Sequence, residues 1–149
     1  MDHRDVTGFA TMLRDTAAKF HDATAVVMDE GRHSYGSLLQ SGADRARQLG
    51  ALGLRRGDRV ALLMPNCMEF IELLVGASML GVVIVPVNTR FRAHELGHIL
   101  RDSGVAAIFT TGAVDEHVNF KELLAEALPG LTAHTEPDNL ALEGYPHIR

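Results

Sequence analysis

The 149-residue sequence has little of several features that mark particular classes of protein. It contains one cysteine and no tryptophan, and only 5% of its residues are aromatic. A single cysteine cannot form an internal disulfide, which excludes the cross-linked scaffold of small secreted proteins and favours a reducing compartment. Hydrophobic residues nevertheless make up 46% of the chain, enough to argue against a disordered or collagen-like protein. We therefore expect one folded domain with a real core.

An excess of positive charge and a long apolar run are also missing. Fourteen basic and nineteen acidic residues give a net charge of -5, so the composition predicts no nucleic-acid partner. The uncharged, mainly apolar stretch Leu73 to Val87 is shorter than the roughly 20 residues that a membrane-spanning helix needs. The first residues have no apolar segment of the kind found in signal peptides. The sequence thus predicts a cytoplasmic protein with no membrane span.

Helical and strand-like patterns alternate along the chain. Hydrophobic spacing predicts helices over 7–20, from a cap at Ser34 to a stop at Gly53, and over 67–80, 93–102 and 114–128. Strands are predicted over 23–28, 32–35, 58–64, 82–85 and 105–109. The first two strands are expected to form a hairpin. Asn66, with Glu69 three residues later, predicts a capping box at the start of the third helix.

The order of these elements predicts the fold class. The later strands are continuous apolar runs separated by helices, which is typical of a parallel sheet with right-handed crossovers. We therefore expect an α/β fold with a mainly parallel, Rossmann-like sheet and helices on both faces. Apolar periodicity is lost after residue 131, so residues 132–149 are expected to be an irregular or disordered tail.

Several motifs resemble one family. They are Gly57-Asp58-Arg59-Val60-Ala61-Leu62-Leu63-Met64-Pro65-Asn66 followed by Glu69-Phe70, then Gly81-Val82-Val83-Ile84-Val85-Pro86-Val87-Asn88, with Ser34-Tyr35-Gly36-Ser37-Leu38 upstream and Ile99-Leu100-Arg101-Asp102-Ser103-Gly104 downstream. In order and spacing they resemble the N-terminal region of adenylate-forming, AMP-binding enzymes. The similar segments cover about residues 7 to 131, so residues 1–131 are expected to be a partial N-terminal subdomain of the AMP-binding domain. Pro86-Val87-Asn88-Thr89-Arg90 resembles the acyl-CoA synthetase branch, which acts on fatty or aryl acids.

The resemblance implies a ligase that uses ATP, CoA and Mg2+. A carboxylic acid would react with ATP to give an acyl-adenylate, and the CoA thiol would then displace AMP. The family's phosphate loop and its catalytic lysine have no counterpart here, since Lys19 and Lys121 lie in no glycine-rich loop. We therefore predict no catalytic and no metal-binding residue in this chain, leave cofactor-binding residues unassigned, and expect it to be inactive alone.

Three alternatives for the chain stay open at this point. It could be a fragment of a ligase, a separately encoded half that pairs with a complementary C-terminal chain, or a stand-alone binding module without catalysis. The acid that the parent enzyme activates is not encoded in these motifs.

A different motif points to metal chemistry. His94-Glu95-Leu96-Gly97-His98 matches the His-Glu-x-x-His pattern of zinc metalloproteases, in which two histidines one turn apart hold zinc and the glutamate activates water. A third protein ligand is required, and only Glu116 or Glu122 could be nominated. The competing interpretation, which we prefer, places both histidines on the solvent side of a helix whose leucines face the core.

Other residues have a functional and a structural interpretation. Thr110-Thr111-Gly112 follows a strand as a phosphate loop would, but it lacks a lysine and further glycines. Arginine clusters at Arg55, Arg56 and Arg59, and at Arg90 and Arg92, could meet a CoA phosphate, although surface arginines are usually solvated. Cys67 at a helix start could be reactive. The structural interpretation is preferred for each.

Overall fold

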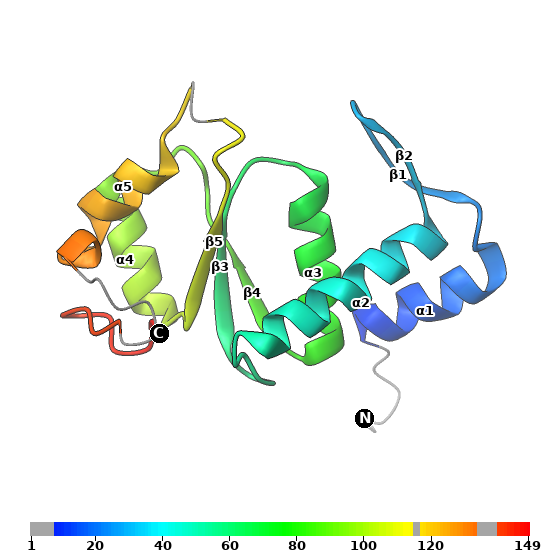
Figure 1. Ribbon diagram of the computed structural model, residues 1–149, viewed down its shortest axis with the longest axis horizontal. Coiled ribbons are helices and arrows are strands. Elements are labelled where there is room, and N and C mark those ends of the chain that lie inside the picture. Colours follow the sequence, from blue (N-terminus) through cyan, green and yellow to red (C-terminus); the bar gives the residue numbers. More distant parts are fainter. Residues whose placement is uncertain (1–7, 115–116, 134–139) are drawn as a thin grey trace, which may run out of the picture. The chain divides into compact units, whose positions relative to one another are not determined.

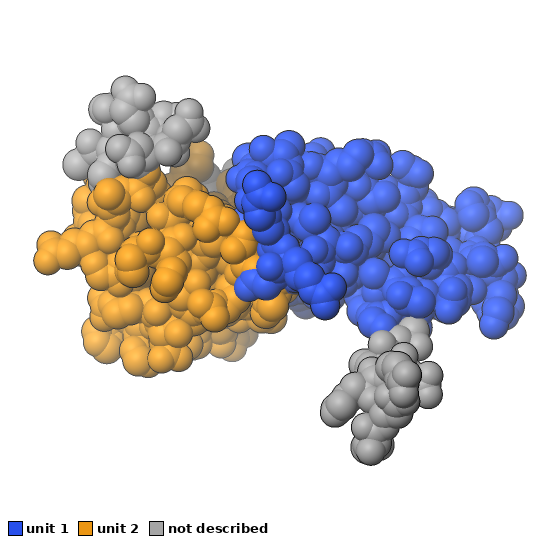
Figure 2. Space-filling model, turned by 90° about the horizontal axis from the view of Figure 1, so that it is seen from below, with its two compact units in different colours: residues 1–57, 66–82 blue, residues 58–65, 83–149 orange. Residues whose placement is uncertain are grey.

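The computed structural model describes residues 8–114, 117–133 and 140–149. The described chain divides into two compact units. Unit 1 comprises residues 1–57 and 66–82, and unit 2 comprises residues 58–65 and 83–149 (Figure 2). Each unit has a hydrophobic cluster of its own, which is the physical reason for the division.

Unit 1 consists of three helices and a hairpin (Figure 1). Its elements are α1 (Phe9–Phe20), β1 (Thr24–Met28), β2 (Gly31–Ser34), α2 (Tyr35–Ala51) and α3 (Met68–Leu80). The predicted hairpin is confirmed, because β1 and β2 pair antiparallel. The buried cluster contains Leu13, Leu38, Met68 and Val75, one or two from each helix. The hairpin adds partly buried side chains to the same cluster.

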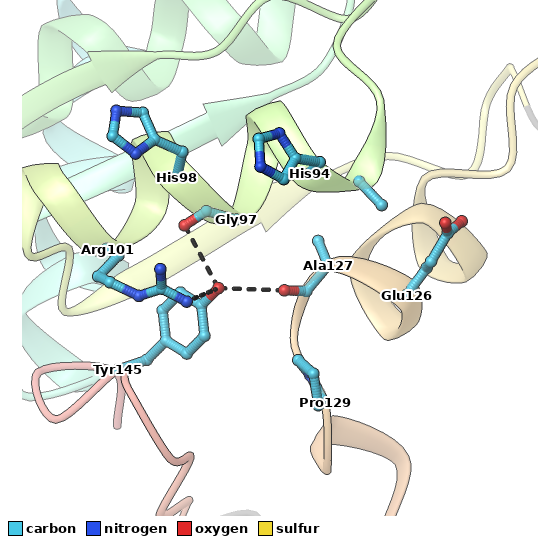
Figure 3. Close-up of a pocket in the computed structure, with 9 residues that line it drawn as sticks. His94, Gly97, His98, Arg101, Glu126, Ala127, Pro129 and Tyr145 are labelled. Atoms are coloured by element: carbon cyan, nitrogen blue, oxygen red, sulfur yellow. Dashed lines mark hydrogen bonds between the residues drawn. The ribbon is translucent and has the colours of Figure 1, made fainter.

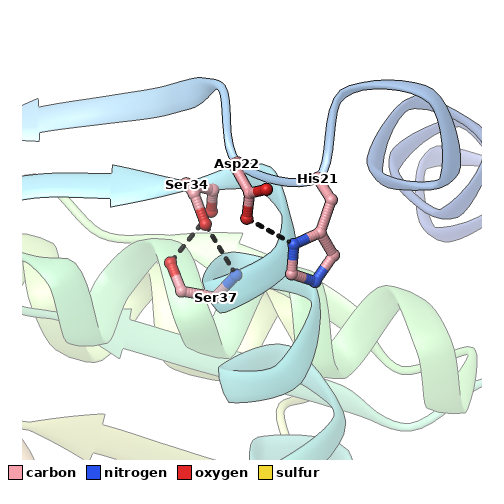
Figure 4. Close-up of polar contacts among 4 residues, drawn as sticks. All are labelled: His21, Asp22, Ser34 and Ser37. Atoms are coloured by element: carbon pink, nitrogen blue, oxygen red, sulfur yellow. Dashed lines mark hydrogen bonds and ion pairs between the residues drawn. The ribbon is translucent and has the colours of Figure 1, made fainter.

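Helix α2 begins with a reciprocal pair of serine contacts (Figure 4). The Ser34 hydroxyl accepts a hydrogen bond from the Ser37 amide at 3.1 Å, and the Ser37 hydroxyl donates to the Ser34 carbonyl at 2.9 Å. The predicted cap is therefore confirmed, and the second bond ties the Ser37 side chain to the backbone of the capping residue. A Cβ at Gly36 would overlap the exposed His21 imidazole, which would have to move aside.

Helices α2 and α3 approach each other closely at two glycines. A Cβ on Gly76 would lie 2.8 Å from the Ala46 amide nitrogen and 2.9 Å from the Gly42 carbonyl oxygen. A partly buried ion pair spans the same two helices, with Arg45 Nη2 2.7 Å from Glu72 Oε2. The two helix backbones can therefore meet only because these positions carry no side chain.

The start of α3 differs from the prediction. Its N-cap is Cys67, and no side chain caps the helix. The capping box predicted from Asn66 and Glu69 is wrong, because Asn66 lies one residue before the cap and outside the helix. The other end matches a common helix stop, with Gly81 in the left-handed conformation at φ 79°.

Unit 2 contains a parallel three-stranded sheet. The strands are β3 (Arg59–Leu63), β4 (Val83–Pro86) and β5 (Ala107–Thr110), in the order β4-β3-β5. The prediction of an α/β fold with a parallel sheet is confirmed. Pro86 was expected to follow its strand but is paired with Leu62 as the last residue of β4. An edge strand tolerates a proline because one side of its backbone needs no donor.

Two helices and a C-terminal segment complete unit 2. Helices α4 (Ala93–Ser103) and α5 (Phe120–Ala127) lie on the same side of the strands (Figure 1). Residues 140–149 contain no helix or strand, yet they bury three side chains in the same hydrophobic cluster: Leu142, Tyr145 and Ile148. The Arg149 amide donates to the Ala106 carbonyl beside β5 at 3.1 Å. The end of the chain thus takes part in the core of unit 2.

The start of α5 corrects the sequence analysis. A helix was predicted from residue 114, but it begins at Phe120. The Asn119 side chain accepts hydrogen bonds from the Lys121 and Glu122 amides, each at 3.1 Å, and so caps the helix. Residues 115 and 116 of the predicted helix lie outside the described residues. No helix of the described chain is both long and apolar enough to cross a membrane.

Candidate functional site

A groove of about 370 Å³ opens between α4, α5 and the C-terminal segment of unit 2 (Figure 3). Its walls are formed by nine residues: Ala93, His94, Gly97, His98, Arg101, Glu126, Ala127, Pro129 and Tyr145. Both histidines of the zinc-protease pattern are among them. The groove is therefore the place to test what that pattern can do.

Tyr145 links the three segments that form the groove. Its hydroxyl lies 3.3 Å from the Gly97 carbonyl oxygen and 3.1 Å from the Ala127 carbonyl oxygen, so its one proton is shared between α4 and the end of α5. Arg101 Nη2 donates to the same hydroxyl at 3.3 Å, and the guanidinium carbon lies 5.1 Å from the centre of the tyrosine ring. The close approach requires a glycine at 97, where a Cβ would lie 2.9 Å from the hydroxyl.

The histidines lie as the preferred interpretation predicts. His94 and His98 are exposed, whereas Leu96 and Leu100 of the same helix are 0% and 1% exposed. Glu95, which would have to activate water in a protease, instead accepts a hydrogen bond from the Arg92 amide at 3.0 Å and caps α4. The carboxylate is therefore used in the fold.

The described residues offer no third ligand for zinc. No three histidine, cysteine, aspartate or glutamate side chains in this part of the chain come together in a way that could hold a metal ion. Glu116, one of the two nominated ligands, lies outside the described residues, and Glu122 joins no such group. A catalytic zinc needs three protein ligands, so the described groove does not form a zinc-protease centre.

The phosphate-loop candidate also has a structural explanation. The Thr110 hydroxyl donates to the Leu63 carbonyl at 2.8 Å, and the Thr111 hydroxyl accepts from the Ala113 amide at 3.1 Å. The Thr110 proton is therefore used within the protein, whereas the Thr111 hydroxyl only accepts there and keeps its own proton. The next helix begins only at Phe120, so the loop does not present a helix N-terminus to a phosphate. These residues do not fit the triphosphate of ATP.

The arginines and the cysteine have mainly local contacts. The Arg59 guanidinium donates to the Gly104 carbonyl at 3.2 and 3.3 Å, which joins the start of β3 to the end of α4. Arg90 and Arg92 are exposed, and Arg55 interacts within the protein. Burial raises the pKa of the Cys67 thiol, and the neighbouring Glu69 raises it further. A raised pKa leaves less thiolate, which is the reactive form.

The contribution of Tyr145 and Arg101 to this groove was not predicted from the sequence. The tail has no helical or strand-like periodicity, and Tyr145 resembles no motif. The one available signal is the spacing of three large apolar residues, Leu142, Tyr145 and Ile148, at every third position. Such spacing in an irregular segment indicates that the side chains are buried, but it does not show which elements they pack against.

Comparisons with known proteins follow the same motifs. The AMP-binding enzyme family matches residues 13–144. The chain is 61% identical over 56 residues to the long-chain-fatty-acid--CoA ligase FadD13 of Mycobacterium tuberculosis, a match that covers 38% of this chain and 11% of that protein. It is 34% identical over 100 residues to a long-chain-fatty-acid--CoA ligase of Bacillus subtilis, a match that covers 67% of this chain and 18% of that protein.

Solved structures agree with these relatives. The N-terminal domain of FACL13 from Mycobacterium tuberculosis matches with a TM-score of 0.67 and 41% identity, over 69% of this chain and 26% of that one. A fatty acyl CoA synthetase of the same organism matches with a TM-score of 0.69 and 34% identity, over 88% of this chain and 24% of that one. The chain thus spans less than a third of the length of the proteins it resembles. Its motifs, its parallel sheet and the match over residues 13–144 together show that the chain belongs to the AMP-binding enzyme family.

Proposed function

We propose that this chain is an N-terminal part of an ATP-dependent acyl-CoA synthetase and does not form acyl-adenylate on its own. The whole enzyme would join a carboxylic acid to ATP, release pyrophosphate, and transfer the acyl group to the thiol of CoA. The chain's own contribution would be scaffold: the helices of unit 1 and the parallel sheet of unit 2. Residues 1–131 would form the partial subdomain, and residues 132–149 an irregular tail that includes the three buried side chains of 140–149.

The proposal rests on one observation: the family matches almost the whole of this chain, but the chain covers only a small part of each relative. The family match extends over residues 13–144 of 149, yet the chain covers only 11% and 18% of two curated ligases. Most of what those relatives contain is thus outside the matched region. The residues that handle ATP would come from there.

The described residues do not fit the cofactors that the family implies. The Thr110 hydroxyl already donates to the Leu63 carbonyl, the 110–112 loop has no lysine, and no described carboxylates gather to hold Mg2+. Lys19 lies in α1 and Lys121 in α5, both within helices rather than in a glycine-rich loop. We therefore assign no step with ATP, Mg2+ or CoA to this chain.

The substrate class follows from the relatives' names and the branch-like motif at residues 86–90. Two of them are long-chain-fatty-acid--CoA ligases, which supports a fatty acid, with an aryl acid as the alternative. A cytoplasmic location fits a ligase of this kind. No residue of this chain is assigned to the acyl pocket.

A second candidate is a separately encoded half that pairs with a complementary chain. One observation favours it: among the described residues, no strand pairs with the outer edge of β5, and an apolar hollow of about 270 Å³ lies beside it. Ile108, Leu124, Leu128 and Leu140 line that hollow. An open strand edge beside an apolar surface is where another chain can add a strand.

Pyrophosphate exchange tests both candidates. The purified chain, given palmitate or benzoate with ATP and Mg2+, should exchange no more label than a blank, and robust exchange would refute inactivity alone. The chain should then be co-expressed with the product of the following reading frame, if that frame carries the phosphate loop and the catalytic lysine. Activity of the pair supports the split enzyme. Unrelated neighbouring frames together with a stable, inactive chain would favour a binding module.

A further inference from the structure

We infer that the groove between α4 and α5 binds a small oxyanion, a carboxylate or a phosphate group, through His94, His98 and Arg101. This site is separate from the adenylation chemistry proposed above and does not depend on it. Its ligand would be recognised by hydrogen-bond donors along one wall of the groove.

The three donors form a row on α4. They are spaced four and three residues apart, which places them on one face of a helix. All three are exposed and all three line the groove. One face of a single helix thus presents two imidazoles and a guanidinium to the same space.

Arg101 is held in position before any ligand arrives. Its guanidinium stacks over the Tyr145 ring at 5.1 Å and donates to the Tyr145 hydroxyl through Nη2. No other side-chain hydrogen bond of Arg101 is found among the described residues, so further N–H donors remain for a ligand. Stacking on an aromatic ring reduces the entropy that a long side chain loses when it binds.

The wall opposite α4, formed by Glu126, Ala127 and Pro129, determines where in the groove a negative charge can lie. Ala127 and Pro129 are apolar, and the Glu126 carboxylate lies toward the His94 end of the groove, away from Arg101 (Figure 3). The negative charge of a bound anion is therefore expected nearer to Arg101 than to Glu126, within reach of both histidines. The volume of about 370 Å³ accommodates a phosphate or a short carboxylic acid with its first waters.

The same geometry disfavours a cation. A metal ion held by the two histidines would face the permanent positive charge of Arg101. No third metal ligand joins the histidines in the described chain. The donors in this groove are better matched to a negatively charged group, which Arg can bind with two parallel bonds.

NMR titration of the full isotope-labelled chain tests the inference. Inorganic phosphate and sodium butyrate are added separately at constant ionic strength, with chloride as the reference. We expect saturable shifts of the His94 and His98 ring signals and of the Arg101 Nε–H signal. The probe that saturates at the lower concentration identifies the preferred class. Shifts that never saturate, equal shifts at His117, or no shift with either probe would overturn the site.

Variants distinguish the site from general charge effects. Arg101→Gln should weaken binding about tenfold, the usual effect of removing a charged hydrogen-bond donor. The double variant His94→Gln with His98→Gln leaves the Arg101–Tyr145 contact in place and should weaken binding about fivefold or more. Arg90→Gln and His117→Gln, which lie outside the groove, should leave it unchanged. Equal weakening by these controls would refute the inference.

Discussion

The two units of this chain reach close packing by different means. In unit 1, α2 and α3 meet where side chains are absent, at Gly42 and Gly76. In unit 2, the contact between α4, the end of α5 and the tail depends on a large side chain, Tyr145, whose hydroxyl bonds to two backbone carbonyls. An added methyl group at Gly76 should therefore be harmful in unit 1, and loss of the Tyr145 hydroxyl should be harmful in unit 2.

The two kinds of contact also differ in how easily the surrounding atoms can adjust to a substitution. A methyl group on Gly76 would meet the backbone of α2, which cannot move without shifting the whole helix. Loss of the Tyr145 hydroxyl would remove its bonds to the Gly97 and Ala127 carbonyls but would keep the ring in place. We therefore expect the added methyl group at Gly76 to lower the free energy of unfolding more than the loss of the Tyr145 hydroxyl does.

Gly76→Ala should produce the largest effect. The new Cβ would lie within 3 Å of three atoms of α2, two of them backbone atoms, and we expect a loss of about 3 kcal/mol in the free energy of unfolding. Urea unfolding measures this directly. Gly50→Ala is the matched control, since no atom lies within 4 Å of a Cβ there, and it should stabilise the chain by about 0.5–1 kcal/mol.

Amide hydrogen exchange on the Gly76→Ala variant sharpens the comparison. If the two units unfold independently, protection should fall in α2 and α3 and remain in β3 and α4. A uniform loss across both units would mean that they unfold as one cooperative body. A Gly76→Ala variant as stable as the parent would contradict the close approach itself.

Tyr145→Phe should have a smaller effect, confined to unit 2. The ring and its stacking on Arg101 remain, but the bonds to the Gly97 and Ala127 carbonyls are lost, at a cost of about 1–2 kcal/mol. Thermal unfolding and exchange at the α4 amides report the change. Tyr35→Phe is a suitable control, because no hydrogen bond of its hydroxyl is found in the described residues, and it should change stability by less.

Alkylation of Cys67 is expected to show the smallest effect, in unit 1 alone. Burial and Glu69 raise the pKa of this thiol, so at pH 8 the folded chain should react with iodoacetamide more slowly than the urea-unfolded chain. Raising the pH should narrow the difference as the thiolate forms. Glu69→Gln removes one of the raising causes and should speed the reaction about twofold, while Glu143→Gln in unit 2 should not. A folded chain that reacts faster than the unfolded one would refute the assigned direction.

Much of the fold could be predicted because local patterns agree with it. Ser34 precedes an apolar helical face and forms the expected cap. The apolar run at 60–63 predicted a buried parallel strand, and all four residues are 0% exposed. In these places propensity, capping and burial favour the same structure, so a few neighbouring residues are sufficient to predict the element.

The sequence analysis failed where two local signals competed or where the contact is distant. Hydrophobic spacing from Val114 placed the helix start too early, because Asn119, with Glu122 three residues later, is the signal that begins α5. The division into units depends on α3 packing against α2 rather than remaining with the strands that flank it in sequence. The Tyr145 contacts join residues 18 and 48 positions apart, beyond the reach of any periodicity.

The route of the chain has a consequence for synthesis and dissection. The polypeptide passes from unit 1 into unit 2 at residue 58, returns at 66, and leaves again at 83. No single cut can therefore release either half intact. On the ribosome, the helical unit can close once residue 82 has emerged, whereas the sheet waits for β5, which ends at Thr110, and its hydrophobic cluster is complete only with Ile148. A nascent chain would therefore hold β3 without one of its neighbours until β5 has emerged, and chaperone capture should be strongest between residues 82 and 110.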